Sequence, residues 1–194
     1  MNPFVLENHE NIVLIGMPGS GKSSIGKRLH NMTKLPLLDI DDHIEYSTKK
    51  KVSDIIQEIG EDAFLDLESE IVQSIKPQGM IISCSGSVPL RQEAMNHLRE
   101  TGKSIYIDVP VSIIVARLHR MKADRIIGMN GKSPMTLEEV LAYRESFYEM
   151  SYDYRFSCTD NITADEKAIR FLDFCKMKIP DLIPKESKKE KLAA

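Results

Sequence analysis

A glycine-rich segment near the start of the chain has the residue types needed to bind phosphate. Gly16–Ser23 has the sequence GMPGSGKS, which fits the spacing G-x-x-x-x-G-K-S/T. Glycines let backbone N–H groups approach an anion closely, and the lysine brings a positive charge to the β- and γ-phosphates of a nucleotide. The segment follows the apolar run Asn11–Ile15 and precedes an amphipathic stretch, as a phosphate-binding strand–loop–helix unit requires. We therefore expect an ATP site here.

Individual residues of this loop have separate expected roles. Lys22 is expected to act in catalysis by stabilising the charge of the transferred phosphoryl group. The hydroxyl of Ser23 is placed to ligate Mg²⁺. The nucleotide ligands expected from this part of the chain are Gly16, Gly19, Ser20, Gly21, Lys22, Ser23 and Ser24.

Two carboxylates follow the next apolar run. Asp39 and Asp41 are two residues apart in Leu37–His43 (LLDIDDH), so an extended backbone would direct both side chains to the same side. In an open α/β sheet the carboxyl ends of the strands face the ligand crevice. Asp39 is thus a candidate to support Mg²⁺ through water, and Asp41 a candidate to accept a hydrogen bond from a substrate hydroxyl. The alternative is that Asp41 or Asp42 caps the start of a helix.

Cations later in the chain could stabilise charge on a transferred phosphoryl group. Segment 122–134 (KADRIIGMNGKSP) contains two glycines and little periodicity, and we interpret it as a mobile lid beside an active site. An ordinary surface connection is the alternative. Arg125 lies in this segment and is the strongest candidate for a catalytic arginine. The other candidate arginines are Arg117, Arg120 and Arg144.

Strand and helix patterns alternate along the chain, which predicts a three-layer α/β/α domain with a central parallel sheet of about five strands. Capping boxes start the last two predicted helices, at Thr136 with Glu139 and at Thr163 with Glu166. The predicted strands are 11–15, 37–40, 80–83, 104–108 and 156–158. The predicted helices are 22–32, 53–59, 61–75, 89–101, 111–121, 137–152 and 164–178.

Composition limits the class of protein. The chain has 194 residues, 42% hydrophobic content and a net charge of −3, which suits one domain and gives no positive field for nucleic acid. No apolar run approaches the roughly 20 residues that cross a bilayer. The three cysteines lack metal-ligand spacing and are expected to be free thiols in a reducing compartment. We expect a cytoplasmic monomer with no nucleic-acid or membrane partner.

The end of the chain differs in character from the rest. Residues 180–194 contain two prolines and then a run of lysines and glutamates, which predicts a charged, solvated tail. The last four residues, Lys191–Ala194, resemble the start of a vector-encoded tag. The domain that contains the phosphate loop is accordingly expected to comprise residues 1–179.

Taken together, these motifs resemble shikimate kinases. The resemblance rests on the phosphate loop, on Asp-x-Asp in LLDIDDHIE, on Ala123–Arg125 in the lid and on Leu141–Tyr148 (LAYRESFY). It extends from about Ile12 to Ile169. It implies a nucleoside-monophosphate-kinase-like sheet with a lid, the use of ATP and Mg²⁺, and phosphoryl transfer to one hydroxyl of a cyclic hydroxy acid.

The resemblance also implies a role for each matching side chain. Asp41 would hold the substrate hydroxyls and act as base, and Asp39 would support Mg²⁺. Arg144 would pair with the substrate carboxylate. Arg125 would close over the phosphates, and Arg117 would lie near the adenine.

Two positions depart from the family pattern. Leu65 stands after Phe64 where the family has an arginine that binds the carboxylate, and Ser85–Ser87 stands where the family has three glycines. Loss of one charge-assisted hydrogen bond of about 1.5–3 kcal/mol weakens binding roughly ten- to a hundredfold. The leucine therefore suggests a less acidic or bulkier substrate, and Arg91 is a candidate to compensate. Gly86 is the one glycine retained and is expected to contact substrate.

The first functional hypothesis is an ATP-dependent kinase for shikimate or a related hydroxy acid, which would serve aromatic amino acid biosynthesis. A kinase for a less acidic small-molecule alcohol is a second. A third is a catalytically impaired ATP-binding module that acts through protein partners; the departures favour it, whereas the retained Lys22, Asp41 and Arg144 argue against it. A nucleotide kinase ranks lower, because no obvious set of base-reading residues is present.

Overall fold

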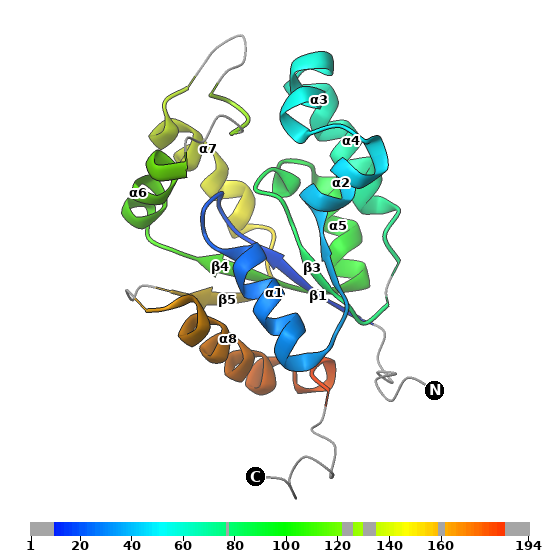
Figure 1. Cartoon of the computed structure of the whole chain (residues 1–194), viewed down its shortest axis with the longest axis vertical. Coiled ribbons are helices and arrows are strands. Elements are labelled where there is room, and N and C mark those ends of the chain that lie inside the picture. The colour runs from blue at the N-terminus through cyan, green and yellow to red at the C-terminus, as the bar shows by residue number, and fades with distance from the viewer. Residues whose placement is uncertain (1–9, 77, 122–125, 130–134, 159–161, 185–194) are drawn as a thin grey trace, which may run out of the picture.

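Apolar runs form one five-stranded parallel sheet in the computed structural model of the chain, which describes residues 10–76, 78–121, 126–129, 135–158 and 162–184 (Figure 1). The strand order is β2-β3-β1-β4-β5. All five residues of β1 are buried, as expected for a central strand covered on both faces. The strands are β1 (Asn11–Ile15), β2 (Leu37–Asp39), β3 (Ile81–Ser83), β4 (Gly102–Asp108) and β5 (Tyr154–Ser157).

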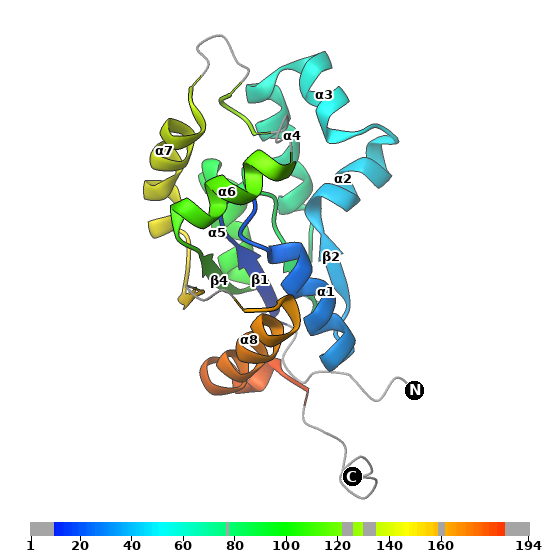
Figure 2. The same ribbon diagram turned by 60° about the vertical axis from the view of Figure 1, so that its left-hand side comes forward.

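Helices cover both faces of this sheet (Figures 1 and 2). Helices α1 and α8 lie side by side on one face, while α5 packs against β4 and α4 on the other. The helices are α1 (Lys22–Thr33), α2 (Ile40–Thr48), α3 (Val52–Ile59), α4 (Glu61–Gln73), α5 (Gln92–Thr101), α6 (Val111–Met121), α7 (Leu137–Glu149) and α8 (Ala164–Lys178), with short 3₁₀ turns η1 (Val88–Leu90) and η2 (Pro180–Leu182).

Because every strand is parallel to its neighbours, the loops that follow the strands leave the sheet at the same edge. Helices α2 and α3 rise above this edge on one side, and α6 and α7 rise on the other (Figure 1). The loop after β1, the start of α2 and the loop after β3 therefore meet between them. The fold thus brings together the three segments that sequence analysis selected for chemistry.

The predicted five-stranded parallel sheet is confirmed, and so are both capping boxes. One helix was not predicted: strand β2 ends at Asp39, and Asp41 lies in the first turn of α2. The expectation that both aspartates point the same way from one strand is therefore wrong. The helix predicted at 89–101 is divided, because residues 88–90 form a 3₁₀ turn that contains Pro89 before α5 begins.

The packed part of the chain continues past the boundary predicted at residue 179. Leu182 and Ile183 are 2% and 6% exposed and belong to the hydrophobic core. These two apolar residues follow Pro180 directly, and the turn η2 directs them back against α8. Residues 185–194, which include the charged run and the tag-like end, lie outside the described residues, as do 122–125 and 130–134 of the expected lid.

Within the part of the chain that the structure describes, no helix combines the length and apolar character needed to cross a membrane.

Candidate active site

A cavity of about 780 Å³ opens at the carboxyl edge of the sheet. It is bounded by the phosphate loop, the first turns of α1 and α2, helices α3 and α4, the loop after β3 and helix α7. The residues that line it are Pro18, Gly19, Gly21, Lys22, Ser23, Ser24, Asp41, Val52, Ile56, Phe64, Cys84, Ser85, Gly86, Ser87, Leu118, Ile126, Ile127 and Arg144.

The phosphate loop has the backbone geometry that its glycines allow. Gly19 and Gly21 have φ values of 78° and 100°, a region in which a side chain is strained. The backbone N–H of Ser20 donates to the carbonyl of Met17 at 3.0 Å and closes the loop. Among the described residues, the buried hydroxyl of Ser20 has no hydrogen-bond partner. Ser20 does not line the cavity, and its hydroxyl lies on the side of the loop next to Gly16.

Lys22 lies buried at the base of the cavity. Its Nζ donates to the carbonyl oxygens of Gly16 at 2.7 Å and Met17 at 3.1 Å. Burial lowers the pKa of Lys22 to about 8, although the nearby Asp41 carboxylate acts in the opposite direction. The ammonium group therefore remains mostly protonated at neutral pH and keeps a positive charge beside the loop.

The residues expected to support Mg²⁺ lie close to one another. Asp39 at the end of β2 pairs in register with Ser83 at the end of β3, and the Oγ of Ser83 is 3.4 Å from the Oγ of Ser23. Among the described residues, no group of three or more acidic, histidine or cysteine side chains could hold a metal by itself. One hydroxyl and one carboxylate fit Mg²⁺, which usually takes few protein ligands and completes its shell with phosphates and water.

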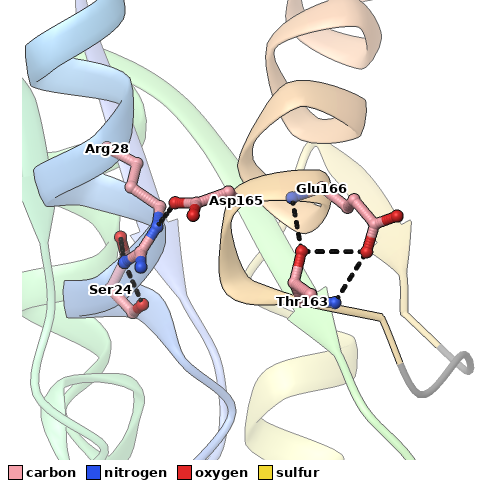
Figure 3. A network of polar contacts seen from close by, with 5 residues as sticks. All are labelled: Ser24, Arg28, Thr163, Asp165 and Glu166. Atoms are coloured by element: carbon pink, nitrogen blue, oxygen red, sulfur yellow. Dashed lines mark hydrogen bonds and ion pairs between the residues drawn. The ribbon is translucent and has the colours of Figure 1, made fainter.

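Ser24, expected to contact the nucleotide, is held from the side of α8 (Figure 3). Its Oγ accepts a hydrogen bond of 2.8 Å from Nη1 of Arg28, and Nε of Arg28 pairs with Oδ1 of Asp165 at 2.5 Å. Asp165 lies in the first turn of α8, between Thr163 and Glu166, the two residues that form the capping box. The start of α8 therefore positions the helix that follows the phosphate loop.

Asp41 reaches the cavity from the first turn of α2. Its side chain is accessible from the cavity, but the surrounding protein removes much of its water, and Asp39 adds repulsion. Both effects raise the pKa of Asp41 to about 6, whereas the charge of Lys22 opposes the rise. A carboxylate with this pKa is ionised at neutral pH and suits a general base.

Arg144 of α7 is 2% exposed and lines the cavity. Its Nη1 donates to the carbonyl of Gly86 and its Nη2 to the carbonyl of Ile127, both at 2.9 Å. Within the described residues, Arg144 forms no ion pair with a carboxylate. Burial lowers its pKa, while the nearby Tyr148 and Glu68 act in the opposite direction.

One turn along α7, Tyr148 connects two sides of the cavity. Its hydroxyl lies 2.9 Å from the carbonyl oxygen of Gly16 and 2.8 Å from that of Gly86, and its hydrogen can be donated to either. A Cβ at Gly86 would lie 2.6 Å from Cγ of Pro18 in the phosphate loop. A side chain at position 86, in the loop Ser85–Ser87 after β3, would therefore collide with the phosphate loop.

A buried carboxyl group that sequence analysis did not select lies behind the same loop. Glu68 of α4 is 1% exposed, and its Oε1 accepts a hydrogen bond of 2.5 Å from Oγ of Ser85. Ser85 Oγ also lies 3.0 Å from Ser87 Oγ and accepts from the backbone N–H of Ser87 at 3.2 Å. Burial raises the pKa of Glu68 to about 7, although the two serine hydroxyls act in the opposite direction.

The sequence does contain a signal for Glu68. Leu65, Glu68 and Val72 have the spacing of one helix face, and all three are buried. A glutamate in a buried row of a helix needs a polar partner, and that partner is Ser85 of the altered loop.

The predictions made for three further arginines have different outcomes. Nη1 of Arg117 donates to the carbonyl of Gly19 at 2.9 Å, so this side chain reaches the phosphate loop, and its role near adenine stays a prediction. Arg91 does not line the cavity, because its guanidinium bonds to Asp66 at 2.7 Å on the outer side of α4. The idea that Arg91 replaces the missing arginine is therefore wrong. Arg125 lies outside the described residues.

Comparison with known proteins finds shikimate kinases among those that are similar to this chain. A protein-family model described as shikimate kinase matches residues 18–176. Threonine synthase-like 1 of Mus musculus is 36% identical over 172 residues, which is 88% of this chain but only 23% of that protein. The shikimate kinase of Clostridium botulinum (strain Okra / Type B1) is 33% identical over 144 residues, which is 74% of this chain and 85% of that protein.

Solved structures show the same fold. Shikimate kinase from Acinetobacter baumannii in complex with shikimate has a TM-score of 0.72 at 23% identity and covers 88% of this chain and 95% of its own. Shikimate kinase from Bacteroides thetaiotaomicron has a TM-score of 0.70 at 24% identity and covers 86% of this chain and 98% of its own.

Proposed function

Because the chain belongs to the shikimate kinase family, we propose that it transfers the γ-phosphoryl group of ATP to a hydroxyl of a small molecule. Family and fold both support ATP-dependent kinase activity. One observation carries the proposal further: a single cavity is lined by the phosphate loop with Lys22, by the carboxyl of Asp41 and by the buried guanidinium of Arg144.

On the donor side, backbone N–H groups of the phosphate loop would bind phosphate oxygens. Lys22 would place its charge beside the β- and γ-phosphates. Ser23 would ligate Mg²⁺ and Asp39 would support it through water, and the bound metal would neutralise charge on the phosphates. Arg117 holds the loop itself through the carbonyl of Gly19.

On the acceptor side, Asp41 would accept the proton of the substrate hydroxyl. The hydroxyl oxygen forms the new bond to the γ-phosphorus, the bond to the β,γ-bridging oxygen breaks, and ADP leaves with that electron pair. A pKa of about 6 leaves Asp41 ionised and able to take the proton at neutral pH. The charge of Lys22 would stabilise the phosphoryl group in transit.

Two features of the acceptor side bear on the substrate in opposite ways. Arg144 is a buried cation without a carboxylate partner among the described residues, which favours a hydroxy acid such as shikimate. Leu65 is buried where the family has its second carboxylate-binding arginine, which favours a less acidic alcohol. Both acceptors need the same donor site and the same base.

An ADP-release assay tests the proposal. Purified protein with Mg²⁺ and ATP is offered shikimate, sugars, polyols and nucleosides, and ATP binding is measured separately by calorimetry. Turnover of at least one acceptor, lost in Asp41→Asn and in Lys22→Met, is the expected result. Asp42→Asn removes an exposed neighbouring carboxylate that does not line the cavity and should keep activity.

The same assay exposes the competing function. ATP binding without turnover of any acceptor would refute the kinase proposal. It would favour a nucleotide-binding module that acts through protein partners.

A further inference from the structure

We propose that Ser85 and Ser87, oriented by the buried Glu68, select a neutral polyhydroxylated acceptor over a carboxylate-bearing one. This inference rests on the kinase function proposed above and specifies its substrate class. The acceptor would be a polyol or sugar that donates a hydroxyl hydrogen to the serine pair.

The direction of the hydrogen bonds carries the first step. An ionised carboxylate only accepts hydrogen bonds, so Ser85 must donate its hydroxyl hydrogen to Glu68, 2.5 Å away. Ser85 Oγ then accepts from the backbone N–H of Ser87 at 3.2 Å, and the Ser87 hydroxyl can donate its hydrogen either to Ser85 Oγ, 3.0 Å away, or to Glu68, with which it also forms a hydrogen bond. Both serine hydrogens are therefore used inside the protein.

What remains for the cavity is the oxygen lone pairs that these bonds leave free, above all the two on Ser87 Oγ. Ser85 and Ser87 both line the cavity, whereas Glu68 lies behind them with 1% exposure. Lone pairs repel a substrate carboxylate and accept a hydrogen bond from a substrate hydroxyl. The serine pair thus changes this wall from one that suits an anion to one that suits a hydroxyl donor.

The charges around the cavity also disfavour a substrate carboxylate. Arg144 is the cation expected to attract an acidic acceptor, but the negative charges of Glu68 and Glu61 already interact with it. Two of its N–H groups already donate to the carbonyls of Gly86 and Ile127. Asp41 adds a further negative charge to the same cavity.

The apolar part of the wall agrees with this assignment. In place of the second arginine, α4 carries Leu65, which is buried and does not line the cavity, so this position offers an acidic acceptor no cation. Val52, Ile56 and Phe64 form the apolar part of the cavity wall. Such a surface packs against the C–H face of a ring or carbon chain, while the serine pair and Asp41 bind its hydroxyls.

Matched acceptor pairs test the inference at pH 8, above the pKa of about 7 to which burial raises Glu68. The pairs are shikimate with its hydroxymethyl analogue, and gluconate with glucitol, since each pair differs only in the carboxylate. The loss of one hydrogen bond and the added repulsion should lower kcat/KM for the acid at least about tenfold relative to the neutral partner. Preference for the acid in both pairs would overturn the inference and leave the kinase function intact.

Variants test whether Glu68 orients the serines. In Glu68→Gln an amide N–H can donate to Ser85, so a serine hydrogen can turn toward the cavity, and the neutral-to-acid ratio of kcat/KM should fall several-fold. Ser85→Ala and Ser87→Ala should lower the same ratio and keep the test open if Glu68→Gln does not fold. Glu70→Gln on the exposed side of α4 is the matched control. A ratio that none of the three site variants changes would overturn the inference.

A different result would refute the kinase function itself. If no acceptor in either pair, nor in the wider panel, releases ADP while ATP still binds, the proposed function is refuted and the substrate class falls with it.

Discussion

Replacing Glu68 by glutamine should increase the free energy of unfolding, relative to the parent protein, by more at pH 8 than at pH 5. The glutamate is 1% exposed, and its pKa rises from an ordinary value of 4.5 to about 7 on folding. A raised carboxyl pKa means that the folded state binds the proton more tightly than the unfolded state. The stabilisation that this group provides is therefore full below pH 4.5 and is lost as the pH rises through 7.

The magnitude follows from the two pKa values. They differ by about 2.5, and one pKa unit corresponds to about 1.4 kcal/mol, so the full effect is about 3 kcal/mol. Between pH 5 and pH 8 the unfolding free energy of Glu68→Gln should rise relative to the parent protein by about 2–3 kcal/mol, since part of the titration lies below pH 5. Glutamine cannot ionise, and its amide can still form a hydrogen bond with Ser85.

Urea unfolding measures this difference. The chain contains no tryptophan, so far-ultraviolet circular dichroism is the suitable signal. The charged groups that act on Glu68 include Asp41 and Arg144, and Asp41 also has a raised pKa, but its contribution is shared by both proteins and largely cancels. Glu70→Gln, exposed on the same helix, should show no such rise. A free-energy difference that stays constant from pH 5 to pH 8 would refute the reasoning.

Three further predictions concern activity. The kcat/KM should rise with pH around a midpoint of about 6 as Asp41 ionises, and Asp41→Asn should lose about 10²–10⁴-fold in rate; a flat profile from pH 5 to 8 would contradict its role as base. Gly86→Ala, whose Cβ would lie 2.6 Å from Pro18 Cγ, should cost about 1–3 kcal/mol in urea unfolding and lower kcat/KM. Adding Pro18→Ala should recover part of both losses, and no recovery would exclude the clash as their cause. Leu65→Arg should raise kcat/KM for shikimate relative to its neutral analogue roughly tenfold; an unchanged ratio would mean that the acceptor side differs by more than one residue.

The position and conformation of the phosphate loop could be predicted because the residues that determine them are contiguous. The phosphate loop needs eight consecutive residues after a buried strand, and the chain supplies them at Gly16–Ser23. Its glycine conformations and its lysine follow from local geometry, so the sequence alone locates them. The capping boxes of α7 and α8 are likewise local and were located to the residue.

The acceptor side could not be predicted to the same degree because tertiary contacts build it. Helix α2 was missed since only Ile40 and Ile44 of its nine residues are buried, which leaves little apolar periodicity. The bond between Glu68 and Ser85 joins residues 17 positions apart, and neither residue type indicates the other in advance. The end of the core was placed too early because a charged run follows Ile183 closely and hides the packed turn.

In the proposed kinase, the hydroxyl of Tyr148 would link the strength of ATP binding to the strength of acceptor binding. The hydroxyl lies between the carbonyl of Gly16 in the phosphate loop and the carbonyl of Gly86 in the loop after β3. It has one hydrogen, which it can donate to either carbonyl. A shift of either loop changes the bond available to the other, so ATP and acceptor affinities can be coupled through this one group. Thermodynamic linkage makes such coupling reciprocal: the factor by which ATP tightens acceptor binding equals the factor by which the acceptor tightens ATP binding.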